Sequence, residues 1–131
     1  MLLLSSFLGA TGVALGALGA HALKSKIGLD FTSEQLDAFD TATKYQLLHA
    51  IALLVICIKA EPAKSNWLRR CSQFFAAGTF LFSGSIYFLS TQKLLGITIP
   101  KIIGLLTPVG GVLLIAGWVC LTLHAYSKEK S

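Results

Sequence analysis

Three long runs without a charged side chain constrain this sequence more than any other feature. They cover 23 residues at 1–23, 22 residues at 71–92 and 26 residues at 102–127. An α-helix needs about 20 apolar residues to cross the hydrocarbon core of a bilayer. Each run therefore predicts one transmembrane helix.

A fourth run, residues 45–58, holds only 14 uncharged residues between Lys44 and Lys59. Runs of this length also occur in interfacial or re-entrant segments. Lysines at the end of a span can, however, extend their stems and place the ammonium among the headgroups. Counted from 41 to 60, the segment has 20 residues, so we expect it to cross the membrane.

The composition agrees with that of an integral membrane protein. Hydrophobic residues make up 54% of the 131 positions and charged residues only 13%, whereas soluble domains carry about 25% charged residues. A domain of this size cannot hide so much apolar surface from water. We predict an all-α membrane protein with a single domain over 1–131, a four-transmembrane-helix bundle with helices at about 2–23, 41–60, 68–91 and 102–126.

The segment between the first two spans carries a helix start signal. Thr32 and Gln35 form a capping-box pattern, and Glu34 and Asp37 place acids in the first turn, where the helix dipole is positive. We expect a short amphipathic helix at 33–40 on the membrane surface, continuous with the second span.

The N-terminal run also resembles a cleavable signal peptide, because Ala-His-Ala at 20–22 matches a small-x-small cleavage site. It has no basic n-region, however, and its length exceeds the usual h-region. We therefore expect a retained first helix.

The net charge of +5 does not indicate a nucleic-acid partner, because the eleven Lys and Arg residues are dispersed among the loops. Four spans place both termini on one side, with six basic residues there and five on the other side. The basic second loop favours cytoplasmic termini, whereas Lys24 and Lys26 after the first helix favour the opposite orientation. We predict that both termini are cytoplasmic.

Small residues mark two helix faces for close packing. Gly12, Gly16 and Ala20 lie four apart with Gly19 beside them, a stripe that favours packing within the bundle over homodimerisation. In the last span, Pro108 frees the carbonyl of the residue four positions earlier and predicts a kink toward the bundle interior. Small residues near the kink and in the third span complete the packing set: Gly84, Gly110 and Gly111.

Polar residues of all four spans fall in the half of the bilayer near the first and third loops, as the topology requires. The candidate cluster is His21, Tyr45, Gln46, His49, Ser83, Ser85, Tyr87 and Thr107. Polar groups in lipid face protein and pair with one another, so a structural network is the preferred interpretation. A ligand, ion or proton site remains an alternative, because histidine titrates near neutral pH. Interfacial anchoring and a haem bridged by His21 and His49 are two further alternatives.

The three cysteines and one histidine gather at the opposite end of the spans: Cys57, Cys71, Cys120 and His124. These residue types can bind zinc, but no CxxC spacing is present and free cysteine is common in apolar interiors. We predict no metal and no cofactor. No catalytic triad, carboxylate pair or P-loop pattern is present in the sequence, and we expect a protein that is not an enzyme.

Four segments in order resemble a known family, one segment in each span. They are 14–23, 44–50, 81–87 and 107–111 with 116–118, which read ALGALGAHAL, KYQLLHA, LFSGSIY and TPVGG with AGW. The chain resembles bacterial domain of unknown function 423, which is related to eukaryotic transmembrane protein 256.

The resemblance implies a small multi-pass protein of the bacterial plasma (inner) membrane and implies no activity. The family's recurring residues fall on the candidate cluster together with Gly84 and Pro108, whereas the cysteine set is outside the family pattern. We predict a structural, assembly or interaction component whose partners are lipid and another membrane protein or a second copy. The alternatives are a small-ligand or ion transport unit and a haem-binding protein.

Overall fold

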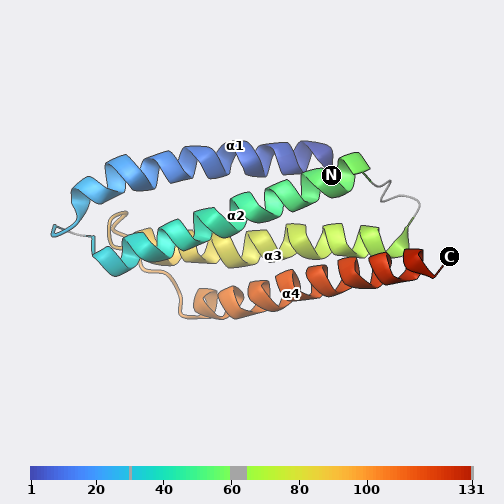
Figure 1. Ribbon diagram of the computed structural model, residues 1–131. Helices are drawn as coiled ribbons and strands as arrows, with labels where there is room; N and C mark the ends of the chain where they lie inside the picture. The colour runs from blue at the N-terminus through green and yellow to red at the C-terminus, as the bar shows by residue number, and fades with distance from the viewer. Residues whose placement is uncertain (30, 60–64, 131) are drawn as a thin grey trace.

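A computed structural model of the protein describes residues 1–29, 31–59 and 65–130. Within these ranges the chain forms four long helices, each long and apolar enough to cross a membrane. They are α1 (Leu2–Leu18), α2 (Ser33–Lys59), α3 (Asn66–Thr91) and α4 (Ile102–Glu129), drawn in Figure 1. The described chain is thus an all-α membrane protein with four spans, as the uncharged runs predict.

The first helical segment changes its winding before it ends. After α1 the chain continues as a π-helical turn, η1 (Gly19–Leu23), and a 3₁₀ turn, η2 (Lys24–Lys26). The backbone N–H of Lys24 donates to the carbonyl of Gly19, five residues back, which is the π-helical spacing. The helix expected at 2–23 therefore lies in the expected place, but its last turns are wider than an α-helix.

The capping box at the start of α2 is confirmed. The backbone N–H of Thr32 donates to Gln35 Oε1 at 2.9 Å, and the N–H of Gln35 donates to Thr32 Oγ1 at 3.2 Å. From this cap α2 runs unbroken from Ser33 to Lys59. The amphipathic stretch at 33–40 is therefore continuous with the second span, as expected; position 60 lies outside the described residues.

The remaining helix ends differ from the prediction by a few residues. Helix α3 begins two residues early, at Asn66, because Ser65 Oγ accepts a hydrogen bond from the N–H of Leu68 and caps it. Helix α4 continues to Glu129, three residues beyond the predicted end at 126. Pro108 lies inside α4, which continues on both sides of it.

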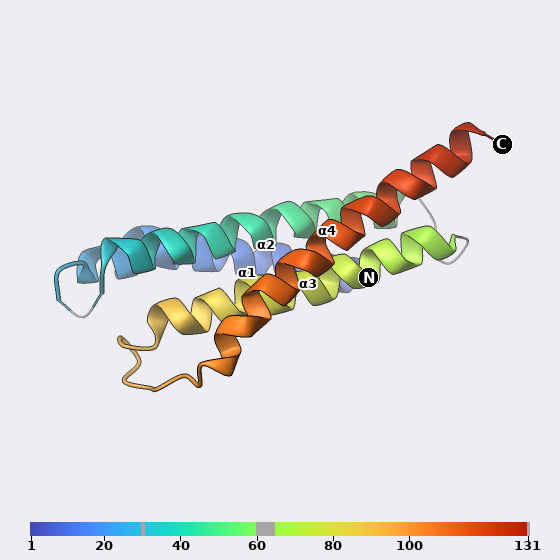
Figure 2. The same ribbon diagram turned by 90° about the horizontal axis from the view of Figure 1, so that it is seen from below.

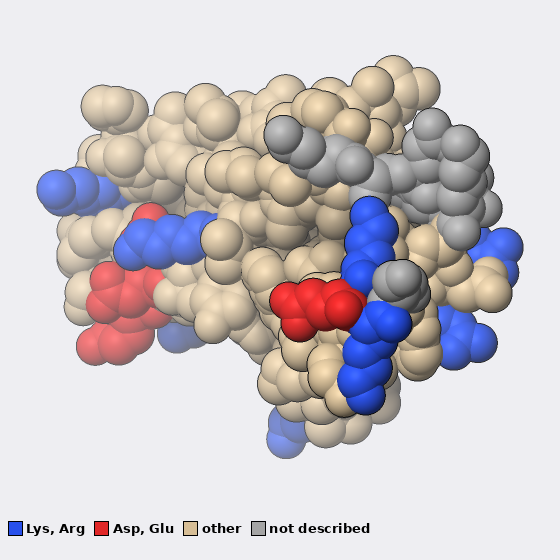
Figure 3. All heavy atoms as spheres, turned by 45° about the vertical axis from the view of Figure 1, so that its right-hand side comes forward, with Lys and Arg blue, Asp and Glu red and all other residues tan. Residues whose placement is uncertain are grey.

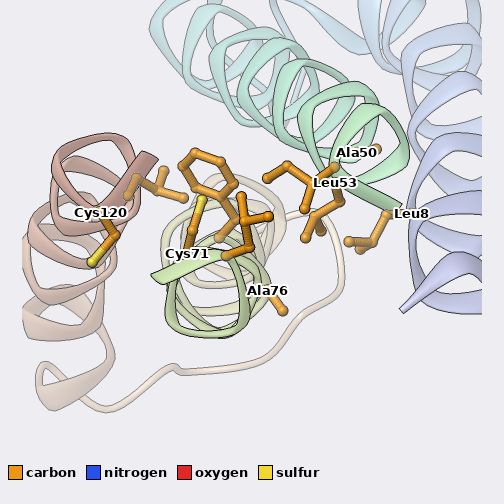
Figure 4. Packing of buried hydrophobic residues seen from close by; sticks show 10 residues of the cluster. Leu8, Ala50, Leu53, Cys71, Ala76 and Cys120 are labelled. Atoms are coloured by element: carbon orange, nitrogen blue, oxygen red, sulfur yellow. The ribbon is translucent and has the colours of Figure 1, made fainter. Parts of the chain in front are cut away.

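Consecutive helices pack along each other, α1 on α2, α2 on α3 and α3 on α4. Figures 1 and 2 place α1 and α4 on the two outer sides with α2 and α3 between them, and α4 crosses α3 at an angle. The bundle is thus an open row in chain order. Its larger apolar cluster joins all four helices and includes Leu8, Leu53 and Cys71, labelled in Figure 4.

The outward faces are suited to lipid. Phe7 and Val13 of α1 and Val112 and Ile115 of α4 are all more than half exposed. On the face drawn in Figure 3 the charged side chains gather in two groups, one toward each end of the molecule, with uncharged surface between them. This distribution fits a bilayer core flanked by two headgroup layers.

Candidate functional site

Gln46 is the centre of the buried polar groups that join the spans. It lies near the middle of α2 and is 5% exposed. Its Nε2 donates to the carbonyl of Leu8 at 2.8 Å and to Thr11 Oγ1 at 2.9 Å, both in α1. One amide side chain therefore fastens α2 to α1, where lipid offers no competing hydrogen-bond partner.

The other end of the same amide reaches α3. Tyr87 donates from its hydroxyl to Gln46 Oε1 at 2.9 Å, with a longer contact of 3.3 Å to Thr43 Oγ1. The Tyr87 ring packs against Phe39 with the ring centroids 4.8 Å apart. The amide and the phenol together link α1, α2 and α3 without leaving either group unpaired.

Two serines of α3 extend the network in both directions. Ser83 Oγ donates to the carbonyl of Ala42 in α2 at 2.8 Å. Ser85 Oγ lies 2.7 Å from Thr107 Oγ1 in α4, and it also donates to the carbonyl of Phe82 at 3.0 Å. Because Ser85 uses its one proton on that carbonyl, Thr107 is the donor in the pair.

His49 joins α2 to α4. Its ring is 2% exposed; Nδ1 lies 2.8 Å from the carbonyl of Tyr45, and Nε2 accepts from Trp118 Nε1 at 3.2 Å. A carbonyl accepts only, so the proton sits on Nδ1, and the indole N–H donates only, so Nε2 carries a lone pair. The hydrogen-bond geometry assigns a neutral imidazole with a single tautomer.

An aromatic group surrounds this pair. The Phe75 ring lies 5.1 Å from both the His49 and the Trp118 ring centroids, at steep angles typical of edge-to-face contact. The Tyr45 ring lies tilted against the Phe82 ring with the centroids 4.7 Å apart, and Tyr45 is 42% exposed, on the outer side of the same region. Both nitrogens of His49 are therefore occupied within a packed aromatic cluster.

The network is complete within the part of the chain that the structure describes. No side-chain nitrogen or oxygen buried there lacks a hydrogen-bond partner. Unpaired polar groups in an apolar medium are costly, and each would have been a candidate for holding a ligand. The polar groups instead saturate one another.

His21 does not join this cluster. It lies in η1 with its side chain exposed. Neighbouring Gly19 lies against the Phe39 ring. Phe39 precedes His49 by ten positions in α2, which corresponds to about 15 Å along a helix axis. The sequence suggested a common depth for His21 and His49. The distance along α2 and the outward direction of His21 separate the two side chains, so they do not form a haem-ligand pair.

The small residues pack helices together inside the bundle. A Cβ on Gly12 would meet the Leu47 side chain at 2.7 Å, and one on Gly16 would meet Thr43 at 3.3 Å, so the stripe faces α2. Ala20 of the same stripe is exposed. A Cβ on Gly110 would overlap the Phe82 backbone of α3.

The other predicted packing glycines differ in role. Gly111 would place a Cβ 3.7 Å from the Phe82 ring, which is ordinary contact, and Gly84 has open space around it. Gly117, which the sequence did not single out for packing, lies against Phe75, with 2.5 Å from an added Cβ to the ring. The α3–α4 contact thus depends on Gly110 and Gly117.

The cysteine set does not converge on one point. Cys71 and Cys120 are buried in the larger apolar cluster, and Cys57 is half-buried. His124 Nδ1 pairs with Ser65 Oγ at 3.1 Å, beside the cap of α3. Among the described residues no group of three His, Cys, Asp or Glu side chains is placed to hold a metal ion.

Sequence reasoning missed three members of the network: Thr11, Thr43 and Trp118. Thr11 is an isolated hydroxyl in an apolar run, and Thr43 lies in the polar segment just before the run at 45–58. Such hydroxyls usually bond to their own helix, and both also do so here. The position of Trp118 in its span could have indicated a hydrogen-bonding role. Membrane tryptophans concentrate at the interface, whereas this one lies near the middle of α4 and needs a partner for its N–H.

The fold and the network define a small multi-pass helical membrane protein whose spans are fastened to one another by polar side chains. Residues 15–111 match the family model described as "Protein of unknown function (DUF423)". The chain belongs to this family, as its four segments predict.

Curated relatives cover almost the whole chain. The UPF0382 inner membrane protein YgdD of Escherichia coli K12 is 35% identical over 130 residues, which is 99% of this chain and 92% of the relative. The UPF0382 membrane protein SAB0533 of Staphylococcus aureus is 35% identical over 116 residues, 87% of this chain and 84% of the relative. No solved structure matches the chain. The protein is a multi-pass protein of the bacterial plasma (inner) membrane, of an uncharacterised family.

Proposed function

We propose that this protein is a non-enzymatic structural or assembly component of the membrane. In this role it is a preformed four-helix unit that offers the lipid-facing sides of α1 and α4 to other membrane proteins. The observation that carries the proposal is the saturated network: Gln46, Tyr87, Ser85–Thr107 and His49–Trp118 bond helix to helix and leave no described buried polar atom unpaired.

The saturation supports a structural role over catalysis or transport. A catalytic or translocating group must exchange protons or ligands, and needs a free acceptor or donor to do so. The described carboxylates lie near the helix ends, and Asp40 pairs with Lys44 at 2.6 Å. The buried polar side chains of the network serve to hold the helices in register.

The open row supports an interaction role. Helices α1 and α4 each have one neighbour along their length and leave a broad apolar face outward. Lipid satisfies such a face, but a second membrane helix with small residues also does so through close packing. We propose that both termini are cytoplasmic, because Arg69, Arg70, Lys128 and Lys130 lie at their end of the bundle.

Site-specific photocrosslinking in living cells tests the interaction role. A photoreactive residue at Val13 or at Val112, which are 65% and 64% exposed on α1 and α4, should give discrete protein adducts. The same residue at Leu53, which is fully buried, is the matched control and should give none. Lipid adducts alone from both exposed positions would contradict the proposal.

His49→Phe tests the structural role separately. The substitution keeps an aromatic ring but removes both hydrogen bonds, so the purified protein should lose thermal stability. If stability is unchanged while a growth or membrane phenotype appears, the imidazole serves a ligand or proton function and the structural proposal fails.

A further inference from the structure

A large apolar cavity opens between the loop-side ends of α1 and α3. Its volume is about 380 Å³, within the range of small-molecule and cofactor sites. Its lining comes from α1, η1, η2, α2, α3 and the loop after α3: Leu15, Leu18, Ala22, Leu23, Lys26, Phe39, Tyr87, Phe88, Thr91, Leu94 and Leu95. Helices that are not consecutive therefore enclose it.

The polar groups of the lining are already used, with one exception. The Tyr87 hydroxyl donates to Gln46, and Thr91 Oγ1 donates to the carbonyl of Tyr87 at 2.7 Å. Lys26 is the only charged residue of the lining, it is exposed, and no described carboxylate pairs with it. The cavity is thus apolar inside and carries one free cation beside it.

The winding of the first helical segment helps to shape this cavity. The π-helical turn η1 contains Ala22 and Leu23, both in the lining, and η2 ends with Lys26. Single π-helical turns in α-helices are frequently found at functional sites. The wider turn is therefore an independent feature that points to the same place.

We propose that this cavity binds an anionic phospholipid of the membrane. One acyl chain lies between α1 and α3 along Leu18, Leu95 and Phe88, and the phosphate lies at the Lys26 ammonium. A neutral amphiphile gains nothing from Lys26, and a polar solute finds no free donor inside. The proposal is independent of the interaction role proposed above, because it uses a different face of the molecule.

Native mass spectrometry of the detergent-purified full chain tests the headgroup. Phosphatidylglycerol and phosphatidylcholine with the same acyl chains are titrated in parallel, with palmitate as a third probe. One lysine near an anionic lipid surface accounts for about a fivefold preference. Lys26→Gln should remove about that factor from the preference for phosphatidylglycerol. Lys101→Gln, an exposed lysine at the same end outside the cavity, should leave it unchanged.

Photoactivatable phosphatidylglycerol with a reactive group on the acyl chain tests the position. Adducts should map to peptides containing Leu18–Ala22 and Leu94–Leu95, and Ala22→Phe, which fills the cavity, should remove them. Leu18→Phe provides a second filling variant in case the first does not fold.

Three results would each overturn the proposal. One is an equal loss of lipid preference in Lys26→Gln and Lys101→Gln, which means diffuse electrostatics. Another is preferential retention of palmitate or of phosphatidylcholine. The last is adducts spread along the exposed face of α4 and unaffected by the filling variants.

Discussion

Trp118 in α4 donates its indole N–H to Nε2 of His49 in α2 at 3.2 Å, across 69 positions of sequence. This bond connects two helices that are not neighbours in the row, and it does so over the Phe75 ring of the intervening α3. It therefore ties α4 to α2 past α3, which α4 crosses at an angle (Figure 2). Four predictions follow from this and related contacts.

The His49–Trp118 pair should show a measurable coupling in a double-mutant cycle. His49→Phe, Trp118→Phe and the double variant should give an interaction free energy of about 0.6 kcal/mol and at most about 2 kcal/mol, the range for hydrogen bonds between membrane helices. Equilibrium unfolding in mixed micelles measures it. A coupling of zero would mean that the two rings pack side by side without the hydrogen bond.

Gln46→Leu should destabilise the protein by roughly 2 kcal/mol, because the amide makes three bonds to other helices at about 0.6 kcal/mol each. Tyr87→Phe should cost about a third as much, since it removes one of these three bonds. Gln73→Leu in α3 is the matched control: Gln73 is exposed, and its replacement should leave the unfolding midpoint in place. Equal midpoints for Gln46→Leu and Gln73→Leu would remove Gln46 from the centre of the network.

Adjacent glycines in α4 should respond in opposite ways. Gly110→Ala forces a methyl group against the Phe82 backbone, with its Cα at 2.8 Å, and should cost about 1–3 kcal/mol, as overpacking does. Gly111→Ala meets only ordinary contacts at 3.7 Å, and it should leave stability unchanged or raise it slightly, because alanine favours the helix. Thermal unfolding of both variants checks the pair, and the reverse ranking would contradict the α3–α4 contact.

Cysteine labelling should place the first and third loops on one side of the membrane. With the native cysteines replaced, Lys24→Cys and Thr98→Cys should both react with a membrane-impermeant maleimide in intact cells. Lys130→Cys should react only after the membrane is opened, because we propose cytoplasmic termini. Labelling of Lys130→Cys alone in intact cells would reverse the orientation, and labelling of only one loop position would break the four-span topology.

The sequence predicted the spans well, because the uncharged runs determine them. It placed the polar residues of the second span too close to the first loop, because the span was counted from position 41, whereas α2 begins at Ser33 and Gln46 lies near its middle. Tyr87, Ser85 and Thr107 lie where the topology places them and do bond across helices. The connectivity between particular atoms was beyond the sequence, since it depends on how each helix is rotated about its axis.

Rotation explains the main error. His21 lies nearer the first loop than His49 and points outward from a π-helical turn, and no periodicity in the glycine-rich first span revealed that turn. The same limit applies to Gly110. The sequence predicted close helix packing at this glycine, but it did not identify the Phe82 backbone as its neighbour.

The packing of each helix on its predecessor has a consequence for how the protein is made. When α2 leaves the translocon, its partner α1 is already in the membrane. In the same way α3 can pack on α2, and α4 on α3, as each is inserted. Most tertiary contacts thus join helices adjacent in the chain, an arrangement that shortens the search for native contacts. Among the described hydrogen bonds between spans, His49–Trp118 joins two helices that are not consecutive, so its formation reports that the last helix has docked on the assembled bundle.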